Sequence, residues 1–110
     1  MKSTTRIMMI YGILSIIALI QSQGATWYVS PNSLFNGPGT SWDNAFHDIQ
    51  SGVDAAVDGD IVLVGDGVYD SGGRTTWYSS LRNRVVVEKN ILVASVNGPN
   101  KTIIVGHGAM

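Results

Sequence analysis

The sequence "GDIVLVGDGVYDSGG", Gly59–Gly73, restricts the fold of this chain more than any other segment. Four consecutive apolar residues, Ile61–Val64, stand directly between two groups of turn-forming residues, Gly59-Asp60 and Gly65-Asp66-Gly67. An apolar run this short, with turn signals at both ends, is typical of a β-strand that is buried on both faces. We therefore expect a strand here rather than part of a long helix.

Several other segments share this character. Short runs rich in β-branched residues occupy 84–88, 91–96 and 102–106, and turn signals separate them. The segment "TWYVSP", 26–31, predicts a further strand that is stopped by proline, whereas 65–83 predicts a long loop. Only 14% of the residues are charged and 13 are glycine. This composition argues against a coiled coil or a charged disordered tail, and favours many short strands with tight turns.

One segment, "NAFHDIQSGVDAAVDGD" at 44–60, has a helical pattern. Its apolar residues fall on one stripe, which consists of Phe46, Ile49, Val53, Ala56 and Val57. Thr40, Ser41 or Asp43 can cap the start of this helix, and Gly59 is suited to end it. Gly52 lies in the middle, where it costs about 1 kcal/mol relative to alanine. The predicted helix therefore depends on packing of its apolar stripe.

The N-terminal residues have the pattern of a secretory signal peptide. The basic residues Lys2 and Arg6 precede an apolar stretch, Ile7–Ile20, and small residues follow it. We assign residues 1–25 to this peptide, with cleavage after Gly24 or Ala25. The alternative is an uncleaved anchor, for which the apolar stretch is short. After cleavage no stable membrane span is expected, and the predicted location is extracellular or at the cell surface.

Two architectures fit this order of elements. One is a small antiparallel sandwich or barrel, and the other is a solenoid in which short strands stack on their counterparts in the next coil. A solenoid needs a cover over its open end. An amphipathic helix just before the first short strand can supply that cover, so the order of elements favours the solenoid.

Three segments also carry a resemblance to a known family. They are "WYVSPNS", "GPGTSWDNAFHDIQSGVDAAVDGDIVLVGDGVYDSGG" and "NRVVVEKNILVASVNGPNKTIIVG", which together cover nearly all of Trp27–Gly106. In this order they resemble the N-terminal region of secreted right-handed parallel β-helix proteins, the pectin-lyase-like superfamily, and most of all its bacterial surface or secreted members. The resemblance implies a mainly β fold in which residues 26–110 are the N-terminal cap and first coils of a parallel β-helix. It also implies a truncated fragment that packs against downstream coils of the same protein.

The resemblance implies a function related to carbohydrates, either binding or cleavage of a polysaccharide. None of the catalytic motifs of the family matches this chain, so no catalytic residue is assigned, and whether the protein is an enzyme stays open between a lyase, a glycoside hydrolase and no activity. A non-catalytic scaffold at the cell surface is the alternative, and a small stand-alone β domain that binds another protein is a third hypothesis.

Candidate ligand contacts lie in the long loop. Trp77 and Tyr78 offer large apolar faces with polar handles, and binding residues tend to lie on loops of a rigid scaffold. Arg74 belongs to a loose basic cluster that is suited to an acidic polysaccharide such as pectate; the cluster also contains Arg82, Arg84 and Lys89. Trp77, Tyr78 and Arg74 are therefore the predicted ligand-binding residues, whereas Trp42 is expected to pack the helix against the first coil.

Other ligand classes receive less support. Loss of Lys2 and Arg6 with the signal peptide lowers the formal net charge from −1 to −3, and an acidic chain of this kind is a poor nucleic-acid binder. Four aspartates near the central strand have oxygen ligands that Ca²⁺ prefers, but aspartate is also common in tight turns; they are Asp58, Asp60, Asp66 and Asp70. We predict no metal site and no cofactor in this segment, and leave calcium open for the full-length protein.

Overall fold

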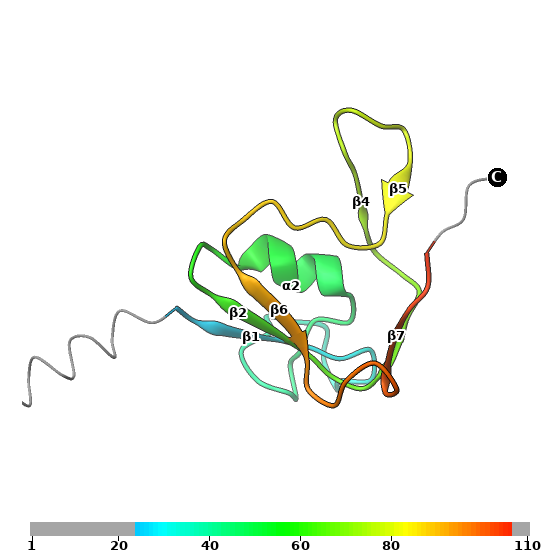
Figure 1. The fold of residues 1–110 in the computed structure, drawn as a ribbon. Coiled ribbons are helices and arrows are strands. Elements are labelled where there is room, and N and C mark those ends of the chain that lie inside the picture. Colours follow the sequence, from blue (N-terminus) through cyan, green and yellow to red (C-terminus); the bar gives the residue numbers. More distant parts are fainter. Residues whose placement is uncertain (1–23, 107–110) are drawn as a thin grey trace, which may run out of the picture.

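The computed structural model describes residues 24–106. Within this range one short helix and seven short strands follow the chain (Figure 1). In order, they are β1 Thr26–Val29, α2 Ile49–Ala55, β2 Ile61–Val64, β3 Gly67–Tyr69, β4 Arg74–Thr75, β5 Arg82–Asn83, β6 Leu92–Ser95 and β7 Thr102–Ile104. The predicted signal peptide, residues 1–25, lies outside the described residues except for Gly24 and Ala25.

The strands form three small sheets. The largest is a parallel sheet in the order β1-β2-β6, in which Thr26 pairs with Ile61 and Ile61 pairs with Leu92. Strands β3 and β7 form a second parallel pair, and β4 and β5 form an antiparallel pair. The segment "IVLV" therefore is the strand β2 that the sequence predicted, and it lies at the centre of its sheet as its apolar character requires.

The predicted solenoid is wrong for the described part of the chain. A right-handed parallel β-helix would stack successive coils around one continuous interior, whereas residues 24–106 form separate small sheets, one of them antiparallel. The antiparallel pair β4–β5 lies between β3 and β6 along the chain (Figure 1). Helix α2 packs against β1 and β2, so it covers the three-stranded sheet that is observed and not the end of a stack of coils.

One predicted strand, 84–88, is not a strand in the structure. The buried side chain of Gln50 instead forms hydrogen bonds with the backbone of this segment. Val86 N–H donates to Gln50 Oε1 at 2.7 Å, and Gln50 Nε2 donates to Val86 O at 3.2 Å. A side-chain amide has the same donor and acceptor groups as a peptide. The segment is therefore held to helix α2 without pairing with a neighbouring strand.

Helix α2 is shorter than the pattern predicted. It begins at Ile49, and Asp48 is its N-cap, with Oδ2 accepting from Ser51 N–H at 3.0 Å. Phe46 lies before the helix and bridges to Val29, and Val57 lies beyond it with 65% of its surface exposed. The predicted burial of Val57 is thus wrong, whereas Ile49, Val53 and Ala56 are buried as expected.

The core lies between helix α2 and the β1-β2-β6 sheet. Its buried cluster consists of Val29, Ile49, Val53, Ala56, Val62, Val64 and Tyr69. The Tyr69 hydroxyl donates to Gly65 O at 2.7 Å, which satisfies the one polar group of this side chain inside the core. Burial, with a smaller contribution from Asp66, raises the pKa of Tyr69 to about 12.

Candidate functional site

Trp77 and Tyr78 form the tip of the β4–β5 hairpin. Ser79 N–H donates to Thr76 O at 3.2 Å, which makes Trp77 and Tyr78 the two central residues of a β-turn. Their side chains are 92% and 71% exposed, and the two rings meet edge to face with centroids 5.5 Å apart. Central turn positions favour small or polar residues. Turn formation therefore does not explain this aromatic pair, and neither does burial in the core.

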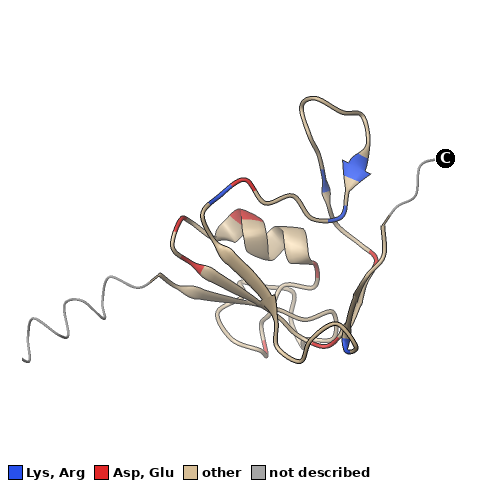
Figure 2. Ribbon diagram, viewed as in Figure 1, with Lys and Arg blue, Asp and Glu red and all other residues tan. Residues whose placement is uncertain are grey.

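Basic residues occur in both strands of the hairpin, which stands away from the main sheet (Figure 2). Arg74 on β4 forms an ion pair with Asp54 of helix α2. Arg84, just after β5, donates to Val105 O at 2.8 Å and to Gly72 O at 2.6 Å. These contacts hold the base of the hairpin, whereas Arg82 on β5 is exposed and pairs in the strand register with Thr75.

The three predicted ligand-binding residues therefore share one hairpin but differ in role. Trp77 and Tyr78 lie together at its tip, and Arg74 lies at its base, where Asp54 neutralises its charge. Arg82 is better placed for a ligand because it is exposed on β5. The sequence placed Arg82 only in the loose basic cluster, because strands of two residues give no hydrophobic periodicity that would reveal a hairpin.

A second candidate region lies where the strands of the parallel sheet end. Ser30, Gly65 and Val96 follow β1, β2 and β6 directly, and they border a hollow of about 340 Å³. Trp42 forms one side of the hollow. Its ring meets the ring of Tyr28 edge to face, with the two ring centroids 4.8 Å apart. The Trp42 ring thus lies against Tyr28 and beside Gly65, whereas the sequence predicted that Trp42 packs the helix against a first coil.

Polar side chains complete this hollow. Asn97 Nδ2 donates to Asp66 Oδ1 at 2.9 Å, which joins the turn after β2 to the turn after β6. The hollow thus combines an aromatic ring with an amide and a carboxylate. The sequence could not predict it, because only the parallel register brings Gly65 and Val96 side by side.

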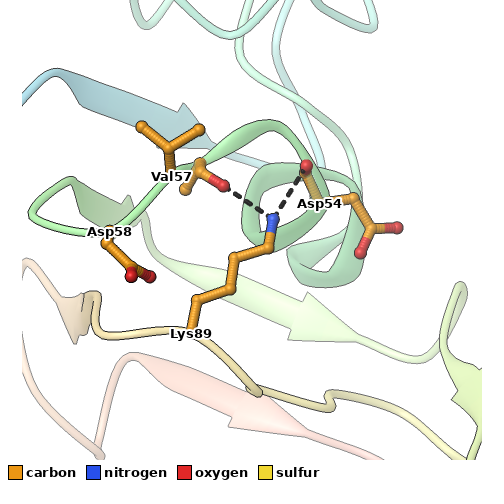
Figure 3. Close-up of a pocket in the computed structure, with 5 residues that line it drawn as sticks. Asp54, Val57, Asp58 and Lys89 are labelled. Carbon is orange, nitrogen blue, oxygen red and sulfur yellow. Dashed lines mark hydrogen bonds between the residues drawn. The ribbon is translucent and has the colours of Figure 1, made fainter.

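A third candidate region is a hollow of about 520 Å³ at the end of helix α2 (Figure 3). Lys89 reaches the end of the helix and donates to Val53 O at 2.9 Å, to Asp54 O at 3.0 Å and to Ala56 O at 2.6 Å. Its ammonium group therefore satisfies carbonyls that a helix leaves without partners. This role is structural, and it removes Lys89 from the candidate ligand contacts.

The four aspartates near β2 have separate roles. Asp60 is buried and accepts three hydrogen bonds. Asp58 accepts from Asn90 N–H at 3.0 Å, Asp66 accepts from Asn97, and Asp70 is exposed. Across residues 24–106, no group of three or more histidine, cysteine, aspartate or glutamate side chains is arranged to hold a metal ion. The structure therefore does not bring these aspartates together as a calcium site.

Comparisons with protein-family models, with curated proteins and with solved structures found no match for this chain. The resemblance to the pectin-lyase-like superfamily stays a prediction, because none of these comparisons tests it. Within residues 24–106, no helix has the length and apolar character needed to cross a membrane.

Proposed function

We propose that this protein binds an extracellular acidic polysaccharide through the tip of the β4–β5 hairpin. The exposed pair Trp77–Tyr78 at the centre of the β-turn is the observation that carries this proposal. Trp77 presents a large apolar face to solvent on a hairpin whose base is fixed by the contacts of Arg74 and Arg84. A fixed, exposed aromatic ring suits the apolar C–H face of a sugar ring.

The sign of the ligand's charge follows from the cations near the tip. The segment from Thr76 to Leu81 carries no carboxylate, and Arg82 follows it directly. A guanidinium group binds carboxylates in a bidentate geometry. A chain of uronic acid units supplies both a sugar face for Trp77 and a carboxylate for Arg82, and this combination favours an acidic glycan over a neutral one.

The hollow beside Trp42 gives separate support for a carbohydrate ligand. Its aromatic ring and its Asp66–Asn97 pair are the kinds of group that recognise sugar hydroxyls, with acceptors and donors beside an apolar face. Both regions are exposed, and neither contains the pairing of acid and base that cleavage would need. The proposal is therefore one of binding.

Affinity electrophoresis in gels that contain polygalacturonate tests the proposal, with dextran gels as the neutral comparison. We expect the protein to be retarded by polygalacturonate, and we expect Trp77→Ala to weaken binding by up to about tenfold through loss of stacking. Arg82→Gln should weaken binding to polygalacturonate and reduce its dependence on salt. Phe35→Ala is the matched control, because Phe35 is also an exposed aromatic residue in a loop.

Two results would overturn the proposal. One is the absence of retardation by any acidic glycan, and the other is equal retardation of Trp77→Ala and Phe35→Ala. A protein ligand is the competing explanation, since exposed Leu81 extends the apolar surface of the tip. Equal retardation would favour that explanation.

A further inference from the structure

The backbone nitrogen of Ala25 lies against a buried carboxylate. Ala25 N–H donates to Asp60 Oδ1 at 2.8 Å, just before strand β1 begins. Ala25 O accepts from Ile61 N–H at 2.9 Å, so both backbone groups of this residue are fixed against the start of β2. The position of the Ala25 nitrogen is therefore set by the sheet.

Asp60 is arranged to hold negative charge at this point. It is only 4% exposed, and its Oδ2 accepts from Trp27 Nε1 at 2.8 Å and from Val57 N–H at 2.9 Å. The donors from Val57, Trp27 and Ala25 keep the pKa of Asp60 below its ordinary value of 3.8, against the opposing effect of burial. The carboxylate is thus ionised at neutral pH beside the Ala25 nitrogen, and no lysine or arginine within residues 24–106 forms an ion pair with it.

Gly24, which precedes Ala25, lies so close to the backbone of Gly59 that a residue with a side chain would clash there. A Cβ added at Gly24 would lie 2.2 Å from Gly59 O. In the sequence, Gly24 and Ser22 are small residues at alternate positions after the apolar stretch, which is the pattern of a cleavage site after Gly24. Cleavage after Ala25 would instead place Gln23 at the first of these positions.

We propose that the chain is processed at the Gly24–Ala25 bond and that the new α-ammonium group of Ala25 forms an ion pair with Asp60. This inference rests on the predicted signal peptide and is independent of the glycan-binding proposal. A peptidase hydrolyses the amide with one water molecule, which leaves a carboxylate on Gly24 and an amine on Ala25 that takes up a proton at neutral pH. The neutral N–H donor to Asp60 becomes a charged donor at the same place.

The proposal predicts that processing stabilises strand β1. A charge-assisted hydrogen bond is about twice as strong as a neutral one, and Asp60 is buried, so solvent screens this pair only weakly. Cleavage one residue later would remove Ala25 and leave the Asp60 oxygen without this donor. The structure therefore favours Gly24–Ala25 over the neighbouring bond, which the sequence alone left open.

The first test is export of the full chain from a bacterial host, followed by mass spectrometry of the secreted product. We expect an N-terminus at Ala25. The second test acetylates the α-amino group of this product at about pH 7, where lysine side chains are protonated and react slowly. Acetylation should lower the folding equilibrium constant roughly fivefold to tenfold, as measured by urea unfolding.

Asp60→Asn provides the control. In this variant acetylation should change the folding equilibrium constant little, because no carboxylate faces the amine. A secreted product that begins at another residue, or that retains residues 1–24, would overturn the proposal. An equal effect of acetylation on the wild type and on Asp60→Asn would also overturn it, even if the N-terminus is Ala25.

Discussion

Gly52 shows how a single residue can be judged wrongly from local propensity. The sequence treats it as a cost, because glycine in a helix is less favourable than alanine. In the structure a Cβ at this position would lie 2.6 Å from Val29 Cγ2 and 3.1 Å from Val62 Cγ1. The missing side chain thus allows helix α2 to approach the sheet closely enough to bury its apolar face.

We expect Gly52→Ala to destabilise the protein by about 1–2 kcal/mol, because overpacking outweighs the gain in helix propensity. Urea unfolding of the variant measures this difference. The double variant Gly52→Ala, Val29→Ala should be more stable than the sum of the two single effects predicts, since Val29→Ala removes the methyl group in the way. A rise in the unfolding midpoint of Gly52→Ala would show that the helix does not sit this close.

Asp60 makes the stability of the folded protein depend on pH in the acid range. Its pKa is lowered in the folded protein, chiefly by the hydrogen bond from Val57 N–H and then by that from Trp27. A group with a lowered pKa stabilises the fold above the unfolded-state pKa, near 3.8, and this contribution is lost as the pH falls through the folded-state pKa. Stability should therefore decline below about pH 4.

Asp60→Asn should lower stability at pH 7 and give a shallower decline in acid, as measured by urea unfolding at pH 7 and pH 3. Asp58→Asn is the matched control, because Asp58 is exposed and, among the described residues, accepts from Asn90 N–H alone. The assignment to Asp60 is contradicted if the two variants have the same acid profile as the wild type.

At the scale of elements, helix α2 depends on a residue far away in the sequence. Lys89 donates to three carbonyls at the end of the helix, which spans only Ile49–Ala55. An isolated helix of this length would not persist in water. The helix is therefore stabilised by its packing and by this cation at its negative end.

Lys89→Met keeps the alkyl chain but removes the ammonium group. We expect a loss of about 1–2 kcal/mol in the free energy of unfolding, since charged hydrogen bonds are lost and the site is partly open to solvent. Lys101→Met, at an exposed lysine, should have little effect on chemical denaturation. Similar midpoints for the two variants would show that the carbonyls are satisfied equally well by water.

The sequence predicted elements well where burial alone decides them. Strand β2 has the predicted bounds, and β1, β6 and β7 lie inside predicted segments. The prediction of a strand at 84–88 is wrong because a side chain, Gln50, supplies its backbone partners. The β4–β5 hairpin was missed. Trp77 and Tyr78, which the sequence singled out as ligand contacts, are exposed at its tip, and their role in binding stays a prediction.

At the scale of the whole molecule, the sequence could not decide how the strands are grouped. The same short apolar runs fit a solenoid, a sandwich or the separate sheets that are observed, because the pattern records burial and not the identity of the partner. The hollow beside Trp42 has the same origin. It exists because three strands end side by side, and no local signal reports that arrangement.

The grouping also leaves apolar side chains on the outer strands. Leu92 of β6 is 57% exposed, and Ile103 and Ile104 of β7 are each about half exposed. Within the described residues β6 pairs only with β2, and β7 pairs only with β3. Edges of this kind, apolar and without charge, promote pairing between molecules.

We expect Leu92→Lys to raise the protein concentration at which light scattering begins, because a charge on an edge strand opposes association. Its effect on unfolding should be small, since Leu92 is exposed. Leu34→Lys adds the same charge at an exposed residue that belongs to no strand. If both variants raise solubility equally, net charge is responsible and the edge is not.

The parallel register has a consequence for folding kinetics. Thr26 must find Ile61, and Ile61 must find Leu92, so each pairing in the sheet closes a long loop. Contacts of this kind require the entropy of loop closure before any burial compensates for it, and chains dominated by them fold in about milliseconds to seconds rather than microseconds. Until the sheet has formed, the apolar strands are exposed to solvent. The folding rate therefore determines how long each molecule exposes them.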